Sequence, residues 1–134
     1  MRLFLDSSVI IDFMGGDSKA IEKIGAAEEI YTSIVCGYEV LVGERFLLLK
    51  GRESKYDRVL DFFKTTATLP PSLDDAKTAS DIMVGLMLAG KVVDPLDTII
   101  AAQAISVDAS LVTKNRKHFD AIREQDGRLK TEYI

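Results

Sequence analysis

The sequence holds a single cysteine among its 134 residues and has no apolar run long enough to span a membrane. One thiol, Cys36, permits no internal disulfide and is consistent with a reducing cytoplasm. The longest apolar stretch, IMVGLMLAG at 82–90, is far shorter than the roughly 20 residues of a transmembrane helix. A carboxylate at position 6 also interrupts any signal-peptide core almost at once. These absences predict a soluble cytoplasmic protein with no membrane association.

The chain also lacks the basic excess of proteins that hold nucleic acid by bulk charge. Lysine and arginine number 17 against 21 aspartates and glutamates, so the formal net charge is −4. A protein that binds nucleic acid mainly through electrostatics is usually basic. If this protein handles nucleic acid, it must therefore neutralise phosphate at a local site, for example with a metal ion.

No internal repeat, linker or low-complexity segment interrupts the chain, which predicts one globular domain over residues 1–134. Short apolar runs predict buried strands at 2–5, 29–33 and 110–113, and a last edge strand is expected near 128–133. Helical patterns lie between them, at about 7–14, 18–27, 34–50, 54–66, 73–89, 95–107 and 116–122. This alternation predicts an α/β fold, a three-layer α/β/α sandwich with a mostly parallel central sheet.

Asp6 directly follows the first predicted strand, where reacting groups of parallel sheets collect. A purely structural role is also open, because aspartate is a preferred N-cap for the helix that follows. Ser7 or Ser8 could provide that cap instead. The position favours a functional carboxylate.

Glu39 lies in the middle of a predicted helix, so helix capping cannot explain it. Val35, Val42 and Phe46 share its face at helical spacing, which predicts a carboxylate within an apolar stripe. A buried ionised carboxylate needs a partner to offset its desolvation. That partner is expected to be a metal ion or, alternatively, a distant lysine or arginine.

Asp94 and Asp97 stand at the start of an apolar helix whose first residue is Pro95. Asp94 falls at the N-cap, and this role accounts for it fully. Asp97 falls at the third position, where glutamate or glutamine is the usual capping partner, so capping explains it less well. Asp97 is therefore a second candidate ligand.

Asp6, Glu39 and Asp97 form a set of separated carboxylates without a cluster of histidine or cysteine. Ligation by oxygen alone suits Mg²⁺ or Mn²⁺ and not zinc. We expect the three side chains to converge on one divalent ion. Such a site is typical of metal-assisted phosphodiester hydrolysis.

A basic run of Lys114, Arg116, Lys117 and His118 follows the 110–113 strand. It is expected to contact RNA phosphate, although a solvated surface turn is equally consistent with it. His118, the only histidine, is interpreted as an RNA contact or a structural residue and not as a catalytic group. The methionine-rich segment 83–90 is interpreted as core in preference to a dimer contact.

Four segments in order, LFLDSSVIIDF, SIVCGYEVLVG, DTIIAAQA and LVTKNRKHF, resemble the PIN domains and within them the VapC-type ribonuclease toxins. The resemblance covers about residues 3–119. It implies catalytic acids at Asp6, Glu39 and Asp97 and a fourth catalytic position at Asn115. The three acids would bind the metal, with Asp94 as an additional ligand. The implied substrate-binding residues are Ser8, Thr113, Lys114, Arg116 and Lys117. Because Asn115 adds no charge, a second metal site is expected to be weak.

The resemblance further implies a Mg²⁺- or Mn²⁺-dependent endoribonuclease that leaves a 3′-hydroxyl and a 5′-phosphate. The implied partners are an RNA substrate, a small cognate antitoxin and a second copy of the chain in a homodimer. A groove for the antitoxin is expected near Phe13 and Met14.

Three alternatives compete with this prediction. A phospho-acceptor signalling domain would need an acidic pair after the first strand, but Asp6 is followed by Ser7 and Ser8. A PIN-like module that binds RNA or protein without cutting has no reason to keep the three acids together. A house-keeping RNA-processing PIN nuclease often carries extra domains or zinc ribbons, and neither is found in this sequence.

Overall fold

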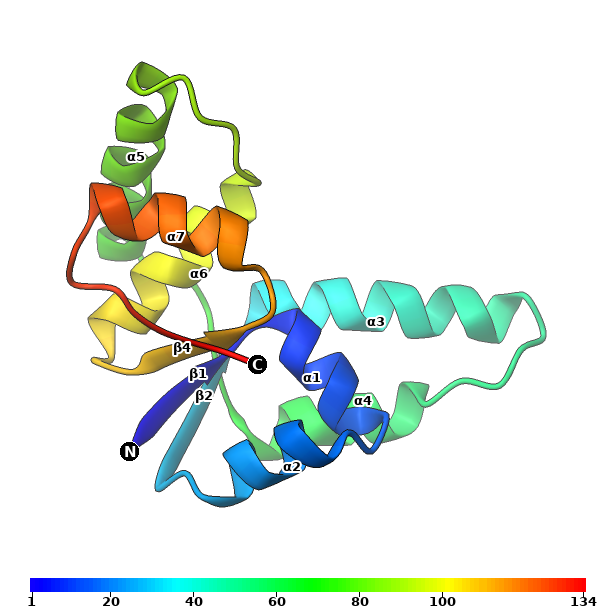
Figure 1. Ribbon diagram of the computed structural model, residues 1–134. Coiled ribbons are helices and arrows are strands. Elements are labelled where there is room, and N and C mark those ends of the chain that lie inside the picture. The colour runs from blue at the N-terminus through cyan, green and yellow to red at the C-terminus, as the bar shows by residue number, and fades with distance from the viewer.

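A parallel sheet forms the centre of the molecule in a computed structural model that describes residues 1–134 (Figure 1). Its strands are β1 (Arg2–Leu5), β2 (Glu29–Ser33), β3 (Ala67–Leu69), β4 (Ser110–Thr113) and β5 (Lys130–Tyr133). They are ordered β3-β2-β1-β4-β5, and every neighbouring pair is parallel. The predicted strands are confirmed, and the extended segment before Pro70 adds the edge strand β3.

Helices cover both faces of this sheet. Leu3, Phe4 and Leu5 have no exposed surface although successive side chains of a strand point to opposite faces. Leu111 and Val112 in β4 are equally buried. Continuous apolar strands of this kind are typical of a parallel sheet between two helical layers, so the predicted three-layer α/β/α fold is confirmed.

The helices begin and end close to the predicted positions. They are α1 (Ser7–Met14), α2 (Ser18–Gly25), α3 (Ile34–Leu49), α4 (Tyr56–Thr65), α5 (Leu73–Leu88), α6 (Pro95–Ser106) and α7 (Arg116–Gln125). The Asp17 side chain accepts a hydrogen bond from the N–H of Ala20 and caps α2. Ser72 and Asp75 form a reciprocal capping box at the start of α5. Local capping chemistry therefore sets these helix boundaries.

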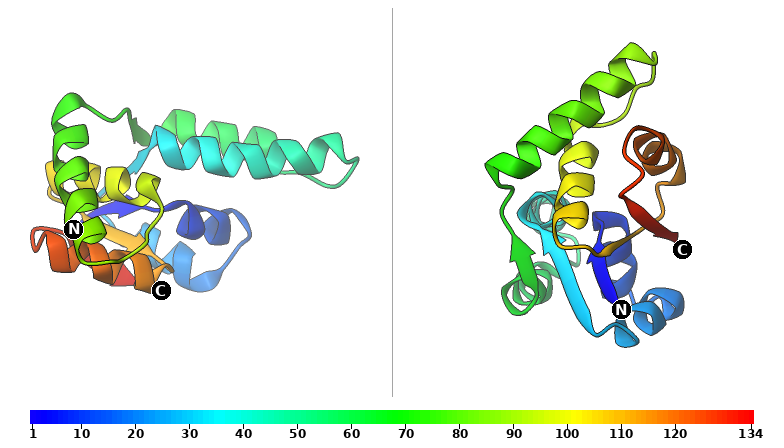
Figure 2. Two further views of the ribbon diagram at one scale, coloured as in Figure 1. Left: turned by 90° about the horizontal axis from the view of Figure 1, so that it is seen from above. Right: turned by 90° about the vertical axis from the view of Figure 1, so that its left-hand side faces the viewer.

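Two parts of the helical layers extend beyond the sheet. α3 and α4 run side by side and project as an arm to the right of the sheet in Figure 1, an arrangement also visible from above in Figure 2. In α5, Leu86 is buried, whereas Met87 and Leu88 are exposed. The prediction that segment 83–90 is core is therefore right for one face of α5 and wrong for the other. None of the helices combines the length and apolar character that crossing a membrane requires.

The strand order reverses between β1 and β4. The chain passes from β1 to β2 and β3 on one side, then crosses through α5 and α6 to reach β4 on the other side of β1. Ligands of doubly wound sheets bind outside the carboxyl ends of the strands at such a switch point. The residues that follow β1 and end β4, Asp6 and Thr113, lie there.

Candidate active site

Asp6 is held firmly at the carboxyl end of β1. Its side chain is buried and caps α1, where Oδ1 accepts a hydrogen bond from the N–H of Ser7 at 2.8 Å. Oδ2 accepts from the Thr113 hydroxyl at 2.6 Å and from the Ser8 hydroxyl at 3.4 Å. The Asp6 N–H donates to the carbonyl of Val112 at 3.1 Å, which ties β1 to β4. The capping role and the strand-end position therefore apply to the same side chain.

Thr113 was expected to contact substrate, and the structure gives it another role. The side chain has no exposed surface, and its hydroxyl donates to Asp6. The same oxygen accepts from the N–H of Asn115 at 3.0 Å, while the Ser8 hydroxyl accepts from the N–H of Lys114 at 3.2 Å. The prediction of a substrate contact is wrong for Thr113, because this hydroxyl fixes Asp6 and the β4–α7 turn instead.

Asp94 and Asp97 divide the two roles expected of them. The Asp94 side chain caps α6 and accepts from the N–H of Leu96 at 3.0 Å. Asp97 does not take part in the cap but points toward α7. Its Oδ2 lies 2.8 Å from Nδ1 of His118 and accepts from Nδ2 of Asn115 at 3.4 Å. The structure therefore joins Asp97 and the fourth predicted catalytic position.

Burial raises the pKa of Asp97 to about 6. The hydrogen bond and charge of His118 lower this pKa, whereas the nearby carboxylates of Asp6 and Asp94 raise it. Desolvation dominates because only 13% of the side chain is exposed. Asp97 is thus a carboxylate whose ionised form lacks sufficient positive charge around it.

The contact between His118 and Asp97 was not anticipated from the sequence. The Asn115 side chain caps α7 and accepts from the N–H of His118 at 3.4 Å, so this cap and His118 lie one helical turn apart on one face. That spacing was visible in the sequence, but the approach of α7 to α6 was not. The structure thus places His118 in direct contact with Asp97, and its non-catalytic role stays a prediction.

Glu39 on α3 lies near the same edge of the sheet, within reach of Ser7, but its side chain is exposed. Of the apolar residues predicted to share its face, Val35 packs against the core, whereas Val42 and Phe46 are exposed, so the prediction that this face buries Glu39 is wrong. Partial burial raises the pKa of Glu39, and Asp6, Asp97 and then Asp94 raise it further by charge repulsion. Only one hydrogen bond reaches its carboxylate, a long one of 3.5 Å from the Ser7 hydroxyl.

The predicted convergence of Asp6, Glu39 and Asp97 on one ion is not met by the side-chain positions. No three or more side chains of histidine, cysteine, aspartate or glutamate are placed to hold a metal ion together. Burial is the main cause of the raised pKa of Glu39, and repulsion from Asp6 and Asp97 adds to it, so the three carboxylates lie near enough to interact and a divalent cation would have to draw them together.

The donor set nevertheless fits a hard divalent cation. Asp6, Glu39 and Asp97 offer only carboxylate oxygens, and no lysine or arginine forms an ion pair with any of them. The alternative of a distant lysine or arginine paired with Glu39 is therefore wrong. Negative charge gathers at this edge with His118 as its one potential cationic contact.

The basic residues after β4 are only partly available to a substrate. Nζ of Lys114 lies 2.9 Å from Oδ2 of Asp12 in an ion pair. The Arg116 guanidinium stacks over the ring of Tyr133, 4.1 Å from its centroid. Lys117 is exposed and takes part in none of the ion pairs. Of the three predicted cations, Lys117 alone has an unengaged charge.

Comparison with known families matches residues 3–125 to the PIN domain. Among curated proteins, the chain is 30% identical over 124 residues to ribonuclease VapC1 of Methanocaldococcus jannaschii, which covers 92% of this chain and 82% of that protein. It is 29% identical over 119 residues to ribonuclease VapC19 of Mycobacterium tuberculosis H37Rv, with 86% and 90% covered.

Solved structures share the fold over nearly the whole chain. VapBC2 from Rickettsia felis, bound to a DNA fragment from its promoter, superposes with a TM-score of 0.79 at 18% identity and covers 100% of this chain and 99% of the matched chain. VapBC-1 from nontypeable Haemophilus influenzae gives a TM-score of 0.77 at 22% identity, with 99% and 98% covered. At these identities the likeness shows the fold alone. On the family match and the curated relatives together, this chain belongs to the PIN domain family and, within it, to the VapC-type proteins.

Proposed function

We propose that residues 1–134 form a single PIN domain that hydrolyses RNA phosphodiester bonds with Mg²⁺ or Mn²⁺ and is the cytoplasmic toxin of a toxin–antitoxin pair. One observation carries the proposal: Asp6, Glu39 and Asp97 gather negative charge at the switch point of the sheet, and no lysine or arginine pairs with them. The curated relatives named ribonucleases support the reaction.

Asp6, Glu39 and Asp97 would hold the divalent ion, with Asp94 adding negative charge nearby. When bound, such an ion acts as a Lewis acid and lowers the pKa of a water molecule. Thr113 and the Ser7 N–H keep both oxygens of Asp6 in fixed directions. His118 and Asn115 both engage Oδ2 of Asp97, which leaves Oδ1 as the oxygen without a protein donor.

Lys117 is the cation best placed to contact the RNA backbone, because Lys114 and Arg116 already have partners within the protein. Ser8 lines the same turn through its contacts with Asp6 and the N–H of Lys114. A single free lysine beside an acidic site fits the negative net charge, since the bulk field of the protein would not attract RNA.

Two exposed apolar surfaces suit the proposed protein partners. A groove of about 560 Å³ lies between the α1–α2 region and α4, and it is lined by Phe13, Met14, Gly16, Ile21, Arg58, Asp61 and Phe62. We assign this groove to the antitoxin, in keeping with solved relatives described as VapBC complexes. The exposed face of α5, which includes Val84, Met87 and Leu88, is assigned to a homodimer contact.

The test is cleavage of single-stranded RNA by the purified protein. Cleavage should require Mn²⁺ or Mg²⁺, stop in chelator, and leave a 5′-phosphate. Asp97→Asn and Glu39→Gln should each remove most of the activity without unfolding the protein. Glu22→Gln is the matched control, because Glu22 is an exposed helical glutamate on α2 without an ion pair. Cleavage that persists in chelator, or in both site variants, would contradict the proposal.

A further inference from the structure

We propose that the pocket between α7 and the loop 91–93 binds an unpaired nucleotide of the RNA substrate beside the cleavage site. The inference rests on the proposed ribonuclease function and adds a substrate-binding site to it. The pocket has a volume of about 410 Å³, within the range of about 300–1,000 Å³ that small-molecule sites occupy. Its lining residues are Lys91, Val92, Val93, Lys117, Asp120, Ala121 and Glu124.

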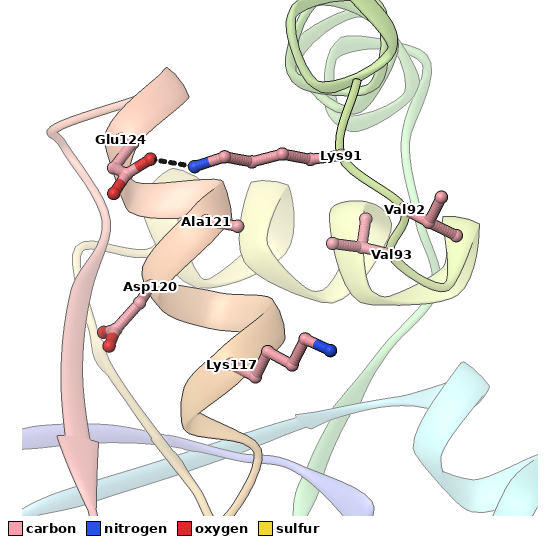
Figure 3. A pocket seen from close by; sticks show the side chains of 7 residues that line it. All are labelled: Lys91, Val92, Val93, Lys117, Asp120, Ala121 and Glu124. Carbon is pink, nitrogen blue, oxygen red and sulfur yellow. Dashed lines mark hydrogen bonds and ion pairs between the residues drawn. The ribbon is translucent and has the colours of Figure 1, made fainter. Parts of the chain in front are cut away.

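The side chains divide this pocket into a closed end, two apolar walls and a charged end (Figure 3). Lys91 crosses from the loop to Glu124 on α7, and their ion pair closes one end. Val93 points from the loop toward Ala121 on α7, so apolar surface faces the cavity from both sides. Lys117 extends across the opposite end.

The charges that line the pocket balance formally, two lysines against Asp120 and Glu124, but they do not all face the cavity. Lys91 is neutralised by Glu124. Asp120 turns away from the cavity, and its Oδ1 accepts from the Tyr133 hydroxyl at 2.6 Å. Lys117, which forms no ion pair, therefore supplies the ammonium group that faces the cavity. One ammonium group next to two apolar walls matches a nucleotide, whose phosphate is anionic and whose base has apolar faces.

The pocket adjoins the acidic site through both of its elements. On the loop, Val93 immediately precedes Asp94, the cap of α6. On α7, Lys117 immediately precedes His118, whose ring contacts Asp97. An RNA strand with its scissile phosphate at the acidic site would therefore present a neighbouring nucleotide to this pocket. A base can enter it only when unpaired, which commits the proposal to single-stranded RNA.

RNA binding can be measured apart from cleavage. A fluorescent single-stranded oligonucleotide is titrated with the full chain in chelator, and its anisotropy reports affinity. Lys117→Ala should weaken binding several-fold and reduce the slope of log affinity against log salt by about one. Lys64→Ala is the matched control, because Lys64 is an exposed lysine on α4 without an ion pair, and it should bind as the wild type does.

A second variant tests the base. Ala121→Phe fills the cavity from α7, and its folding is verified by circular dichroism. The nucleotides of the oligonucleotide are replaced one at a time by an abasic ribose. At one position this replacement should weaken binding to the wild type, whereas binding to Ala121→Phe should not change at that position. An unchanged abasic profile in Ala121→Phe, or equal affinities of Lys117→Ala and Lys64→Ala, would overturn the inference. So would a free nucleoside monophosphate that binds as tightly as the oligonucleotide.

These outcomes separate the two proposals. If the protein cleaves RNA but Lys117→Ala binds RNA as the wild type does, the pocket is contradicted and the ribonuclease function is not. RNA that binds through Lys117 but is never cleaved supports the pocket and contradicts the nuclease. RNA that is neither bound nor cleaved contradicts both.

Discussion

The strand side and the helix side of the acidic site hold their carboxylates in opposite ways. On the strand side, Asp6 is 5% exposed, and hydrogen-bond donors from the backbone of Ser7 and from β4 engage both of its oxygens. On the helix side, Glu39 is exposed and has one long hydrogen bond. Asp97, also on the helix side, is engaged through one oxygen only.

This difference shows which carboxylates the fold itself satisfies. Donors around Asp6 offset the desolvation of its carboxylate. The raised pKa values of Glu39 and Asp97 show that their ionised forms are disfavoured where they stand. Asp6 is thus a structural as well as a functional group, whereas the helical carboxylates gain from an external cation.

The largest difference is expected when one carboxylate on each side is substituted separately. Asp6→Asn should abolish RNA cleavage to the level seen in chelator and lower the free energy of unfolding by about 1–3 kcal/mol, because the amide keeps one acceptor oxygen and one set of donors to Asp6 loses its acceptor. Glu39→Gln should reduce activity too, but change stability at pH 7 by no more than about 0.5 kcal/mol. A raised carboxyl pKa means that ionisation destabilises the fold, so any change for Glu39→Gln should be toward greater stability.

Urea unfolding monitored by circular dichroism provides both stabilities, and RNA cleavage provides both activities. Equal stability losses in Asp6→Asn and Glu39→Gln would remove the distinction between the two sides.

Thr113→Val tests whether the strand side works through its hydroxyl. Losing a buried donor to a charged acceptor should cost about 1.5–3 kcal/mol of stability. It should also weaken Mn²⁺ binding about 10–100-fold, the effect typical of residues that orient metal ligands. Isothermal titration calorimetry and urea unfolding measure the two effects.

Thr32→Val is the matched control on β2, which lies on the other side of β1 from β4. Thr32 is equally buried, but its hydroxyl donates to the neutral carbonyl of Leu5 at 2.8 Å. It should lose about 1 kcal/mol and leave Mn²⁺ affinity unchanged. If the two valine variants bound Mn²⁺ alike, the orienting role of Thr113 would be wrong.

The pH dependence of Mn²⁺ binding tests the helix side. With the pKa of Asp97 raised to about 6, this carboxyl holds a proton below that pH, and the ion must displace it. Affinity should fall about tenfold per pH unit below 6 for one competing proton and level off above it. In His118→Ala the midpoint should move to higher pH, because the hydrogen bond that lowers the pKa of Asp97 is lost.

Asp126→Asn is a suitable control for this titration. Arg128 lowers the pKa of Asp126, which takes no part in the acidic site. Its profile should coincide with that of the wild type. A wild-type midpoint near pH 4 would contradict the raised pKa of Asp97.

The smallest effect is expected at the exposed margin of the site. Lys114→Ala removes the ion pair with Asp12. The Lys114 side chain in this pair is 50% exposed. Exposed pairs contribute about 0–1 kcal/mol, so the free energy of unfolding should change by less than about 1 kcal/mol. Unfolding in 1 M salt should show a still smaller difference between variant and wild type, and a larger one would indicate a structural role.

Much of the fold and part of the site follow from local patterns. The strand runs before Asp6 and Lys114, the capping box of Ser72 and Asp75, and Asp94 before Pro95 each depend on residues close in sequence. Because ligands of parallel sheets bind at the carboxyl ends of the strands, the position of Asp6 directly after β1 predicts its place at the switch point. These features were predictable because backbone hydrogen bonding and helix capping act over a few residues.

Long-range packing decided the rest. The Thr113 hydroxyl reaches Asp6 across 107 positions, and His118 reaches Asp97 across 21. The exposure of Glu39 depends on which face of α3 is buried, the face of Cys36 and Val40, and helical periodicity alone does not reveal this. The sequence by itself determined the position of most elements to within a few residues and which acids stand at their ends. The tertiary structure alone decided which acids are satisfied, because burial and donors come from elements distant in the chain.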